Sequence, residues 1–267
     1  MLKHSSLVMG VAAAALLGLA ASAHAAGIID INESAFQAGA GLITFSEFPG
    51  GTTNPVYAPS AYGGGAGSPT VTFGGFFTGQ SLGTAATCPA GAAVTGCVVG
   101  NPTGPLTLDP NSPQTFISGD GAMPTAPVLS GSPQFNGPIA IEFSTPQTGV
   151  GLIGGYFNAA DSTAITAYDA NGNVIGSVDN PTTGDVFLGL VTADHSATIS
   201  GLLFHLVGDE PAGFDVDNIQ FGVGNQVVVT GGTPEPATWA MMLIGFVGLG
   251  IAGRHVARKR AGAVSLA

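Results

Sequence analysis

Apolar and polar residues alternate along the second half of the chain with the period of two that is typical of β-strands. Ile139, Ile141 and Phe143 alternate with smaller or polar residues, which predicts a half-buried strand. Further apolar runs occupy residues 43–45, 56–57, 71–73, 150–157, 164–168, 174–178, 186–191, 198–207 and 214–221. This part of the chain shows no amphipathic helical pattern, so we expect an all-β domain of antiparallel strands.

A tight hairpin is predicted around Asn171-Gly172, which separates two strand patterns. Both residue types tolerate the positive φ that short hairpin turns need. Asp169, Asn171 and Asn173 also match the first three ligand positions of a calcium loop. The match fails at the following Gly position, which holds Val174. The hairpin is therefore the better interpretation.

The last predicted strand contains four apolar residues in two phases: Phe214, Val216, Ile219 and Phe221. A regular strand buries one face, so burial of all four requires a β-bulge or a new strand start near Asp217-Asn218. Two alternatives are open for Asp215 and Asp217. Their carboxylates could bind Ca²⁺ together with backbone carbonyls of the bulge, or they could accept hydrogen bonds from local backbone N–H groups.

Residues 74–137 are rich in Gly, Pro, Ser and Thr and give a weak strand signal. We expect long loops over one end of the domain, and a binding surface there is an open alternative. Cys88 and Cys97, the two cysteines of the chain, lie in this stretch. In an oxidising compartment we expect them to form a disulfide, which would stabilise the fold by about 2–3 kcal/mol.

Both ends of the chain carry targeting patterns. Lys3 and His4 precede an apolar segment at residues 7–21, and Ala23-His24-Ala25 follows as a small-residue cleavage site. This order predicts a secretory signal peptide over residues 1–25 and a periplasmic start of the mature chain. The β-rich ectodomain then extends over residues 26–230.

The last segment, residues 231–260, combines three parts. Pro234-Glu235-Pro236 is stiff and extended, and residues 237–253 form an uncharged apolar run that begins near Trp239. The run is just long enough for one transmembrane helix with an interfacial aromatic. A basic tail over residues 254–260 follows: Arg254, Arg258, Lys259 and Arg260. The positive-inside rule then predicts an N-out, C-in anchor, and a plain, unprocessed anchor is an open alternative.

This order of parts resembles the PEP-CTERM sorting signal of Gram-negative bacteria, and the spelling PEPATWA at residues 234–240 resembles its PEPxxWA subtype. The resemblance implies that an exosortase recognises Pro234-Glu235-Pro236 and removes the anchor, so that the protein reaches the cell surface or matrix. The strand around Asp217-Asn218 resembles the last strand of the jelly-roll domains common in PEP-CTERM proteins. A jelly-roll-like antiparallel β-sandwich and an association with exopolysaccharide are therefore expected.

Charge is segregated along the chain. All 16 Asp and Glu residues except Glu235 lie between residues 26 and 233, whereas all five Lys and Arg residues lie outside that range. A body without cations cannot neutralise phosphates, so nucleic-acid binding is excluded as a function. Its carboxylates must stay in water, accept hydrogen bonds or bind a cation such as Ca²⁺.

Signals of catalysis are weak. His195 and His205 lie in the body without a G-x-S-x-G nucleophile motif or an H-E-x-x-H zinc motif, and His205 is expected in a strand. Asp209 and Glu210 precede Pro211 and are expected in a solvated turn. We therefore expect no enzyme and no certain cofactor. The alternative is a carboxylate-based glycoside hydrolase that acts on exopolysaccharide.

An exopolysaccharide-binding module would need a sugar-contacting surface. Aromatic rings stack on sugars, and the body offers four tyrosines for this purpose: Tyr57, Tyr62, Tyr156 and Tyr168. Core packing is the alternative role for each of them. An acidic polymer would be repelled by the body unless Ca²⁺ bridges the two, so we expect binding to depend on calcium.

Overall fold

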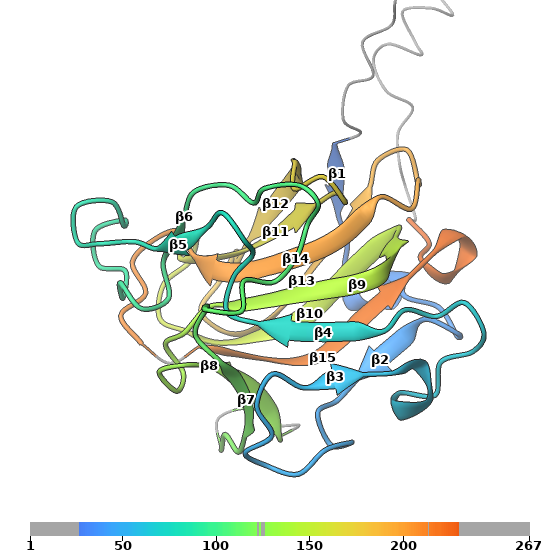
Figure 1. Ribbon diagram of the computed structural model, residues 1–267, viewed down its shortest axis with the longest axis horizontal. Helices are drawn as coiled ribbons and strands as arrows, with labels where there is room; N and C mark the ends of the chain where they lie inside the picture. Colours follow the sequence, from blue (N-terminus) through green and yellow to red (C-terminus); the bar gives the residue numbers. More distant parts are fainter. Residues whose placement is uncertain (1–26, 122, 124–125, 213, 230–267) are drawn as a thin grey trace, which may run out of the picture.

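The computed structural model describes residues 27–121, 123, 126–212 and 214–229. Within these ranges the chain forms two large antiparallel β-sheets packed face to face, with short 3₁₀ turns at Glu33–Ala35, Pro59–Ala61 and Gly224–Gln226 (Figure 1). The expected all-β, sandwich-like fold is confirmed. No helix in the described ranges is long and apolar enough to cross a membrane. The predicted signal peptide, the PEP motif with Trp239, the anchor helix and the basic tail lie outside the described residues.

The first sheet has its strands in the order β1-β13-β10-β15-β8-β7, and β2 also pairs with β15. Their bounds are β1 Ile28–Asp30, β2 Gly41–Ile43, β7 Thr115–Ser118, β8 Val128–Gly131, β10 Gly149–Phe157, β13 Gly184–Thr192 and β15 Asp215–Gly222. The predicted strands at residues 150–157, 186–191 and 214–221 are thus confirmed as the centre of this sheet.

The second sheet has the order β12-β11-β14-β9-β4-β3. Its bounds are β3 Val56–Tyr57, β4 Val71–Gly74, β9 Ile139–Gln147, β11 Thr163–Tyr168, β12 Val174–Asp179 and β14 Ile199–Leu206. From β8 to β15 the chain passes to the other sheet at every connection except the β11–β12 hairpin. Apart from that hairpin, consecutive strands therefore lie in different sheets.

The main core fills the space between the two sheets. Phe157 of β10 and Phe204 of β14 have ring centroids 6.1 Å apart, and Phe204 contacts Phe214 at 5.7 Å. Each of these rings is fully buried. Burial of one such side chain contributes about 1.5–3 kcal/mol, so rings from both sheets hold the layers together.

The predicted bulge in β15 is present. Val216 pairs with Gly154 and Asp217 with Ile153, and the register then shifts before Gln220. Asn218 has a φ of 47°, which a non-Gly residue adopts at such irregularities. The shift buries all four apolar residues of the segment, namely Phe214, Val216, Ile219 and Phe221.

The β11–β12 hairpin is also confirmed, and Asp169 shapes its turn. Asp169 Oδ1 accepts hydrogen bonds from the backbone N–H groups of Asn171 at 2.8 Å and Asn173 at 2.9 Å. Gly172 adopts a φ of 81°. The carboxylate is thus engaged by local donors, as in an Asx-type turn, which supports the hairpin over a calcium loop.

The segment between β4 and β7 covers one end of the sandwich around its disulfide, where the Leu206 N–H donates to the Gly96 carbonyl at 3.0 Å, as the sequence suggested. It also packs on the outer face of the second sheet. Phe77 and Leu106 of this segment contact Ala140, Tyr168 and Leu203, which face away from the main core. Ala140 is consequently buried, and the prediction that one face of residues 139–143 is exposed was wrong for that reason.

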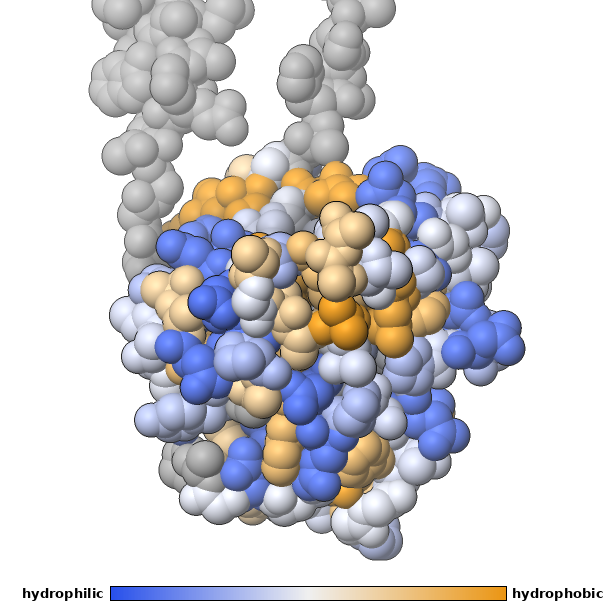
Figure 2. Space-filling view, turned by 90° about the vertical axis from the view of Figure 1, so that its left-hand side faces the viewer, coloured by the Kyte–Doolittle hydropathy of each residue, from blue (hydrophilic) through white to orange (hydrophobic). Residues whose placement is uncertain are grey.

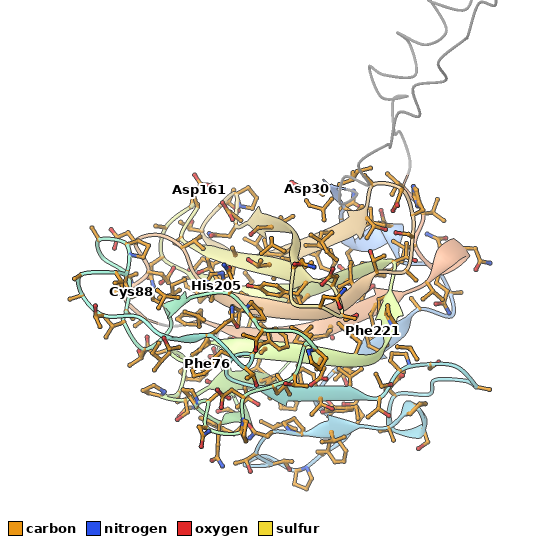
Figure 3. All side chains as sticks on the ribbon, turned by 45° about the horizontal axis from the view of Figure 1, so that its top comes forward. Asp30, Phe76, Cys88, Asp161, His205 and Phe221 are labelled. Atoms are coloured by element: carbon orange, nitrogen blue, oxygen red, sulfur yellow. A yellow bond between two sulfur atoms is a disulfide. The ribbon has the colours of Figure 1, made fainter. Side chains whose placement is uncertain are left out.

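A small two-stranded ribbon lies in the same segment, formed by β5 (Ser81–Leu82) and β6 (Val98–Val99). The predicted disulfide between Cys88 and Cys97 closes its loop, with the Cα atoms 6.0 Å apart. An added Cβ on Gly83 would lie 2.4 Å from Cys88 Sγ, so the disulfide packs directly on the ribbon. Figure 3 shows Cys88 at one end of the molecule and Phe221 towards the other.

Candidate functional site

Four aspartates from three elements gather at the outer face of the first sheet. Asp185 comes from β13, Asp215 and Asp217 come from β15, and Asp120 comes from the connection between β7 and β8. Asp215 and Asp217 share one face of β15 because they are two residues apart, while the intervening Val216 points into the core. We call these four residues the carboxylate cluster.

A glycine brings the β13 and β15 members together. Gly155 of β10 pairs with Asp215 across the sheet. An added Cβ on Gly155 would lie 2.3 Å from Asp185 Oδ1, so the Asp185 carboxylate occupies the space above Gly155. Because Gly155 has no side chain, the Asp185 carboxylate can approach Asp215 across the central strand.

Asp215 is the most unusual member of the cluster. Its side chain is fully buried, and neither carboxylate oxygen has a hydrogen-bond donor. Burial, followed by the neighbouring carboxyl of Asp120 and the charges of Asp185 and Asp217, raises the pKa of Asp215 to about 9. Asp120 and Asp215 could share a hydrogen bond only if one of the two carboxyls carried a proton. Asp215 must therefore take up either a proton or a cation.

Asp217 differs from Asp215 although both are fully buried. The backbone N–H of Asn218 at the bulge donates to Asp217 Oδ1 at 2.7 Å. The alternative that these aspartates satisfy local backbone donors thus describes Asp217 and does not describe Asp215. Among the described residues, no group of three or more His, Cys, Asp and Glu side chains lies close enough to hold a metal ion. A cation here would be bound by fewer carboxylates, with carbonyls and water as further ligands.

Residues 233–259 match the family model of the PEP-CTERM protein-sorting motif. The chain is a PEP-CTERM protein. The motif implies export across the inner membrane, processing by an exosortase and a surface location. The PEPxxWA subtype stays a prediction. No curated protein matches the sequence.

The four tyrosines of this PEP-CTERM protein have different surroundings. Tyr57 and Tyr168 are buried, and Tyr168 Oη accepts a hydrogen bond from Gln80 Nε2 at 3.2 Å. Tyr62 donates to the Pro69 carbonyl and packs edge-on against a phenylalanine ring. Tyr156 is 52% exposed and directly follows Gly155 in β10. Core packing therefore explains Tyr57 and Tyr168, and Tyr156 is the tyrosine whose ring is free to contact a ligand.

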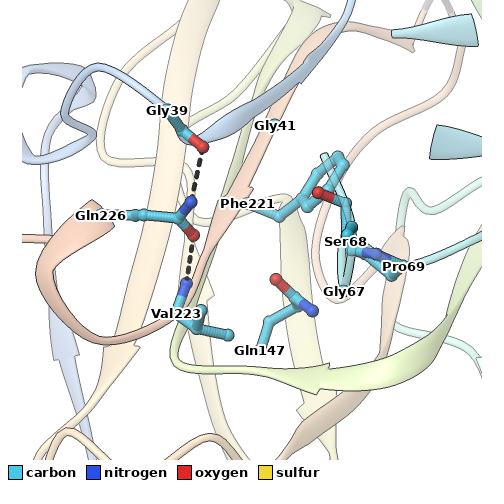
Figure 4. A pocket seen from close by; sticks show the side chains of 10 residues that line it. Gly39, Gly41, Gly67, Ser68, Pro69, Gln147, Phe221, Val223 and Gln226 are labelled. Carbon is cyan, nitrogen blue, oxygen red and sulfur yellow. Dashed lines mark hydrogen bonds between the residues drawn. The ribbon is translucent and has the colours of Figure 1, made fainter. Parts of the chain in front are cut away.

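A hollow of about 290 Å³ lies at the other end of β15, lined by Phe221, Gly41, Gln147 and the loop around Ser68 (Figure 4). Gln226 spans one side of it. Its Nε2 donates to the Gly39 carbonyl at 2.6 Å, and its Oε1 accepts from the Val223 N–H at 2.9 Å. The Gln226 amide is thus already hydrogen-bonded within the protein. No charged side chain is among the residues that line this hollow, so we do not consider it the candidate site.

A second hollow, of about 330 Å³, lies between β1, β12 and β13 and includes Asp30 and Asp179. Burial, followed by the charges of Asp161 and Asp30, raises the pKa of Asp179. These three carboxylates are exposed to solvent. Water can therefore solvate the charges of Asp30, Asp161 and Asp179, whereas the carboxyl of Asp215 is buried.

Glu210 corrects the expectation of a solvated turn. It is fully buried, and its carboxylate accepts hydrogen bonds from the Asn158 backbone N–H at 2.8 Å and from Ser162 Oγ at 3.1 Å. The neighbouring Asp209 is exposed as expected. Proximity to Pro211 thus indicated the turn correctly, but Glu210 points inward because Asn158 supplies donors.

His205 lies in β14, as expected. Its Nε2 is 3.3 Å from Thr166 Oγ1, whereas its Nδ1 is enclosed and has no hydrogen-bond partner. Burial lowers the pKa of His205 to about 4. A neutral, enclosed imidazole bonded to a threonine is a structural residue rather than a catalytic base.

Sequence reasoning named Asp215 and Asp217 but missed Asp120 and Asp185. Asp185 was indicated indirectly by Gly154-Gly155, since consecutive glycines within a strand mark a close approach of another group. Asp120 follows Gly119 in a loop-like stretch and gave no signal. Its place in the cluster depends on how the β7–β8 hairpin folds over β15.

Proposed function

We propose that the body of this PEP-CTERM protein is a non-catalytic module that associates with exopolysaccharide at the cell surface, with Ca²⁺ as a bridge to acidic polymer. Before processing, the predicted helix at residues 237–253 would hold it in the inner membrane, with its C-terminus in the cytoplasm. The single observation that carries the proposal is the sorting motif attached to a β-domain without any Lys or Arg. Such a body needs a cation to approach an anionic polymer.

The strand order supports the jelly-roll interpretation of this body. The strands β8 to β15 alternate between the sheets apart from the β11–β12 hairpin, as the two interleaved Greek keys of a jelly roll require. Such domains offer a broad sheet face to ligands. In this chain the outer face of the second sheet is covered by residues 76–108, so the first sheet is the better candidate.

Tyr156 supports a sugar contact on that first sheet. It is exposed, it directly follows the glycine that pairs with Asp215, and an exposed aromatic ring can stack on a sugar ring. On the face shown in Figure 2, hydrophobic and hydrophilic residues are interspersed, with the largest apolar areas in its upper half.

A carboxylate-based glycoside hydrolase is the alternative function. The raised pKa of Asp215 would suit a general acid, as in glycosidases with two carboxyl groups. Complete burial of Asp215 argues against this role, because a general acid must reach the glycosidic oxygen. We therefore favour the binding module.

One experiment separates the two functions. The exported protein is incubated with the polymer of its own producer, with Ca²⁺ or with EDTA, and both retention on the polymer and reducing ends are measured. The module predicts retention that EDTA abolishes and no reducing ends. Steady release of reducing ends would establish the hydrolase, and absence of retention under both conditions would contradict polysaccharide association.

A matched pair of variants tests the contact surface. Tyr156→Ala removes the exposed ring that follows Gly155 in β10, whereas Val174→Ala removes an exposed apolar side chain on β12. We expect weaker retention for the first variant and unchanged retention for the second. Equal retention by both variants would exclude Tyr156 from the sugar contact.

A further inference from the structure

The Asp215 carboxylate is buried without a group that compensates for its charge. The side chain is fully buried and both oxygens lack a donor. A buried carboxylate is unfavourable unless a positive charge or hydrogen bonds compensate for the lost hydration. The body contains no Lys or Arg that could do so.

The two histidines of the body are not suitable partners either. His205 lies in β14 of the other sheet and bonds to Thr166. His195 lies in the turn after β13, at the opposite end of that strand from Asp185. The charged groups that act on Asp215 are instead Asp120, Asp185 and Asp217. A proton or a metal cation must supply the missing positive charge.

We propose that Asp215 and Asp120 bind a divalent cation, preferentially Ca²⁺, between β15 and the β7–β8 connection. Carboxylate oxygens are the ligands that Ca²⁺ prefers, and it accepts irregular ligand sets completed by carbonyls and water. Asp185, above Gly155, and Asp217, on the bulge, add negative charge around the site. The site is independent of polysaccharide association, because the protein alone supplies it.

The position of the pair suggests a structural role for the cation. β8 pairs with β15 through Val216 opposite Leu129, and β7 is attached to the sheet through β8. Asp120 lies in the connection that joins β7 and β8, whereas Asp215 lies within the sheet. A shared cation would therefore fasten the β7–β8 hairpin to the rest of the first sheet.

Thermal unfolding of the full chain, purified in mild detergent without polymer, tests the site. Traces are recorded in EDTA, in CaCl₂ and in NaCl of equal ionic strength. Extracellular calcium modules have dissociation constants of about 10⁻⁴–10⁻³ M. At a Ca²⁺ concentration of about 100 times that constant we expect the unfolding temperature to rise by about 5–10 °C. An equal rise in NaCl, or no rise in CaCl₂, would overturn the proposal.

Isosteric variants assign the response to residues. Asp215→Asn removes the charge without changing the shape of the side chain, so it should abolish the response to CaCl₂. In EDTA it should unfold at the same temperature as the wild type or at a higher one, because a repulsive buried charge is gone. Asp209→Asn, at an exposed carboxylate outside the cluster, should respond like the wild type.

Asp120→Asn provides a second variant in case Asp215→Asn does not fold, and it should also lose the response. Titration calorimetry with CaCl₂ should give one site per chain in the wild type and none in either variant. Retained binding in Asp215→Asn, or a lower unfolding temperature of that variant in EDTA, would exclude Asp215 as a ligand and favour a shared proton. In that case the polysaccharide test stated above would still stand by itself.

Discussion

Asp185 lies where a side chain on Gly155 would otherwise be. The distance from an ideal Gly155 Cβ to Asp185 Oδ1 is 2.3 Å, far below van der Waals contact. Since Gly155 pairs with Asp215, this small residue allows carboxylates of two non-adjacent strands, β13 and β15, to approach across β10. The glycine is thus part of the cluster although it contributes no functional group.

Substitution of Gly155 should therefore destabilise the first sheet. Gly155→Ala would force Asp185 and its backbone away from β10, and overpacking of this kind typically costs about 1–3 kcal/mol. Denaturant unfolding would show the loss as a lower midpoint. Gly65→Ala is the matched control, because an added Cβ there meets no atom within 4 Å. Equal midpoints for the two variants would contradict the close approach of Asp185.

His205 predicts a loss of stability at acid pH. Its folded pKa of about 4 lies below the ordinary value of 6.5, so protonation favours the unfolded chain. Neutral His205 contributes to the free energy of unfolding in full above pH 6.5. This contribution is lost as the pH falls towards 4, by at most about 3 kcal/mol. Between these pH values, the free energy of unfolding should change less steeply with pH in His205→Gln than in the wild type.

The control for that prediction is His195→Asn, which changes an exposed turn residue with a φ of 56° that Asn tolerates. It should keep the slope of the wild type. Since carboxylates also titrate in this range, the difference between the His205→Gln and wild-type unfolding curves is the relevant measurement. A constant difference from pH 7 to pH 4 would show that His205 does not control the acid transition.

The disulfide should be formed in the exported protein. Thiol labelling under denaturing conditions without reductant should modify neither Cys88 nor Cys97, and two labelled cysteines would refute the bond. The Cys88→Ser/Cys97→Ser double variant should lose about 2–3 kcal/mol of unfolding free energy. Reductant should lower the stability of the wild type by a similar amount and leave that of the double variant unchanged.

The strands could be predicted because their signals are local. In β15, the change of phase between Val216 and Ile219 required a bulge, and the structure contains it at Asp217-Asn218. The β11–β12 turn was likewise encoded within a few residues, by Asp169 and Gly172. Such patterns follow from the geometry of the strand itself.

The rest depends on contacts between distant segments. Ala140 is buried by Phe77 and Leu106, whose own stretch has no clear period. Glu210 turns inward because Asn158 and Ser162, far away in sequence, donate to it. The carboxylate cluster required the register of β13, β10 and β15, which a single sequence does not reveal. Two of its four members were therefore found only in the structure.

The sorting motif leads to the last prediction, which concerns residues outside the described ranges. Replacement of Pro234, Glu235 and Pro236 by Ala removes the rigid segment that the family model and the resemblance assign to exosortase. The variant should remain in the inner membrane, whereas the wild type should lose the segment from Trp239 to Arg260. Cell fractionation with mass spectrometry of the C-terminal peptide measures both.

The control variant Val229→Ala/Thr230→Ala/Gly231→Ala, immediately upstream of the motif, should be processed normally. In a host without exosortase all three chains should stay in the membrane. An intact C-terminus on surface material from the wild type would contradict processing at this motif.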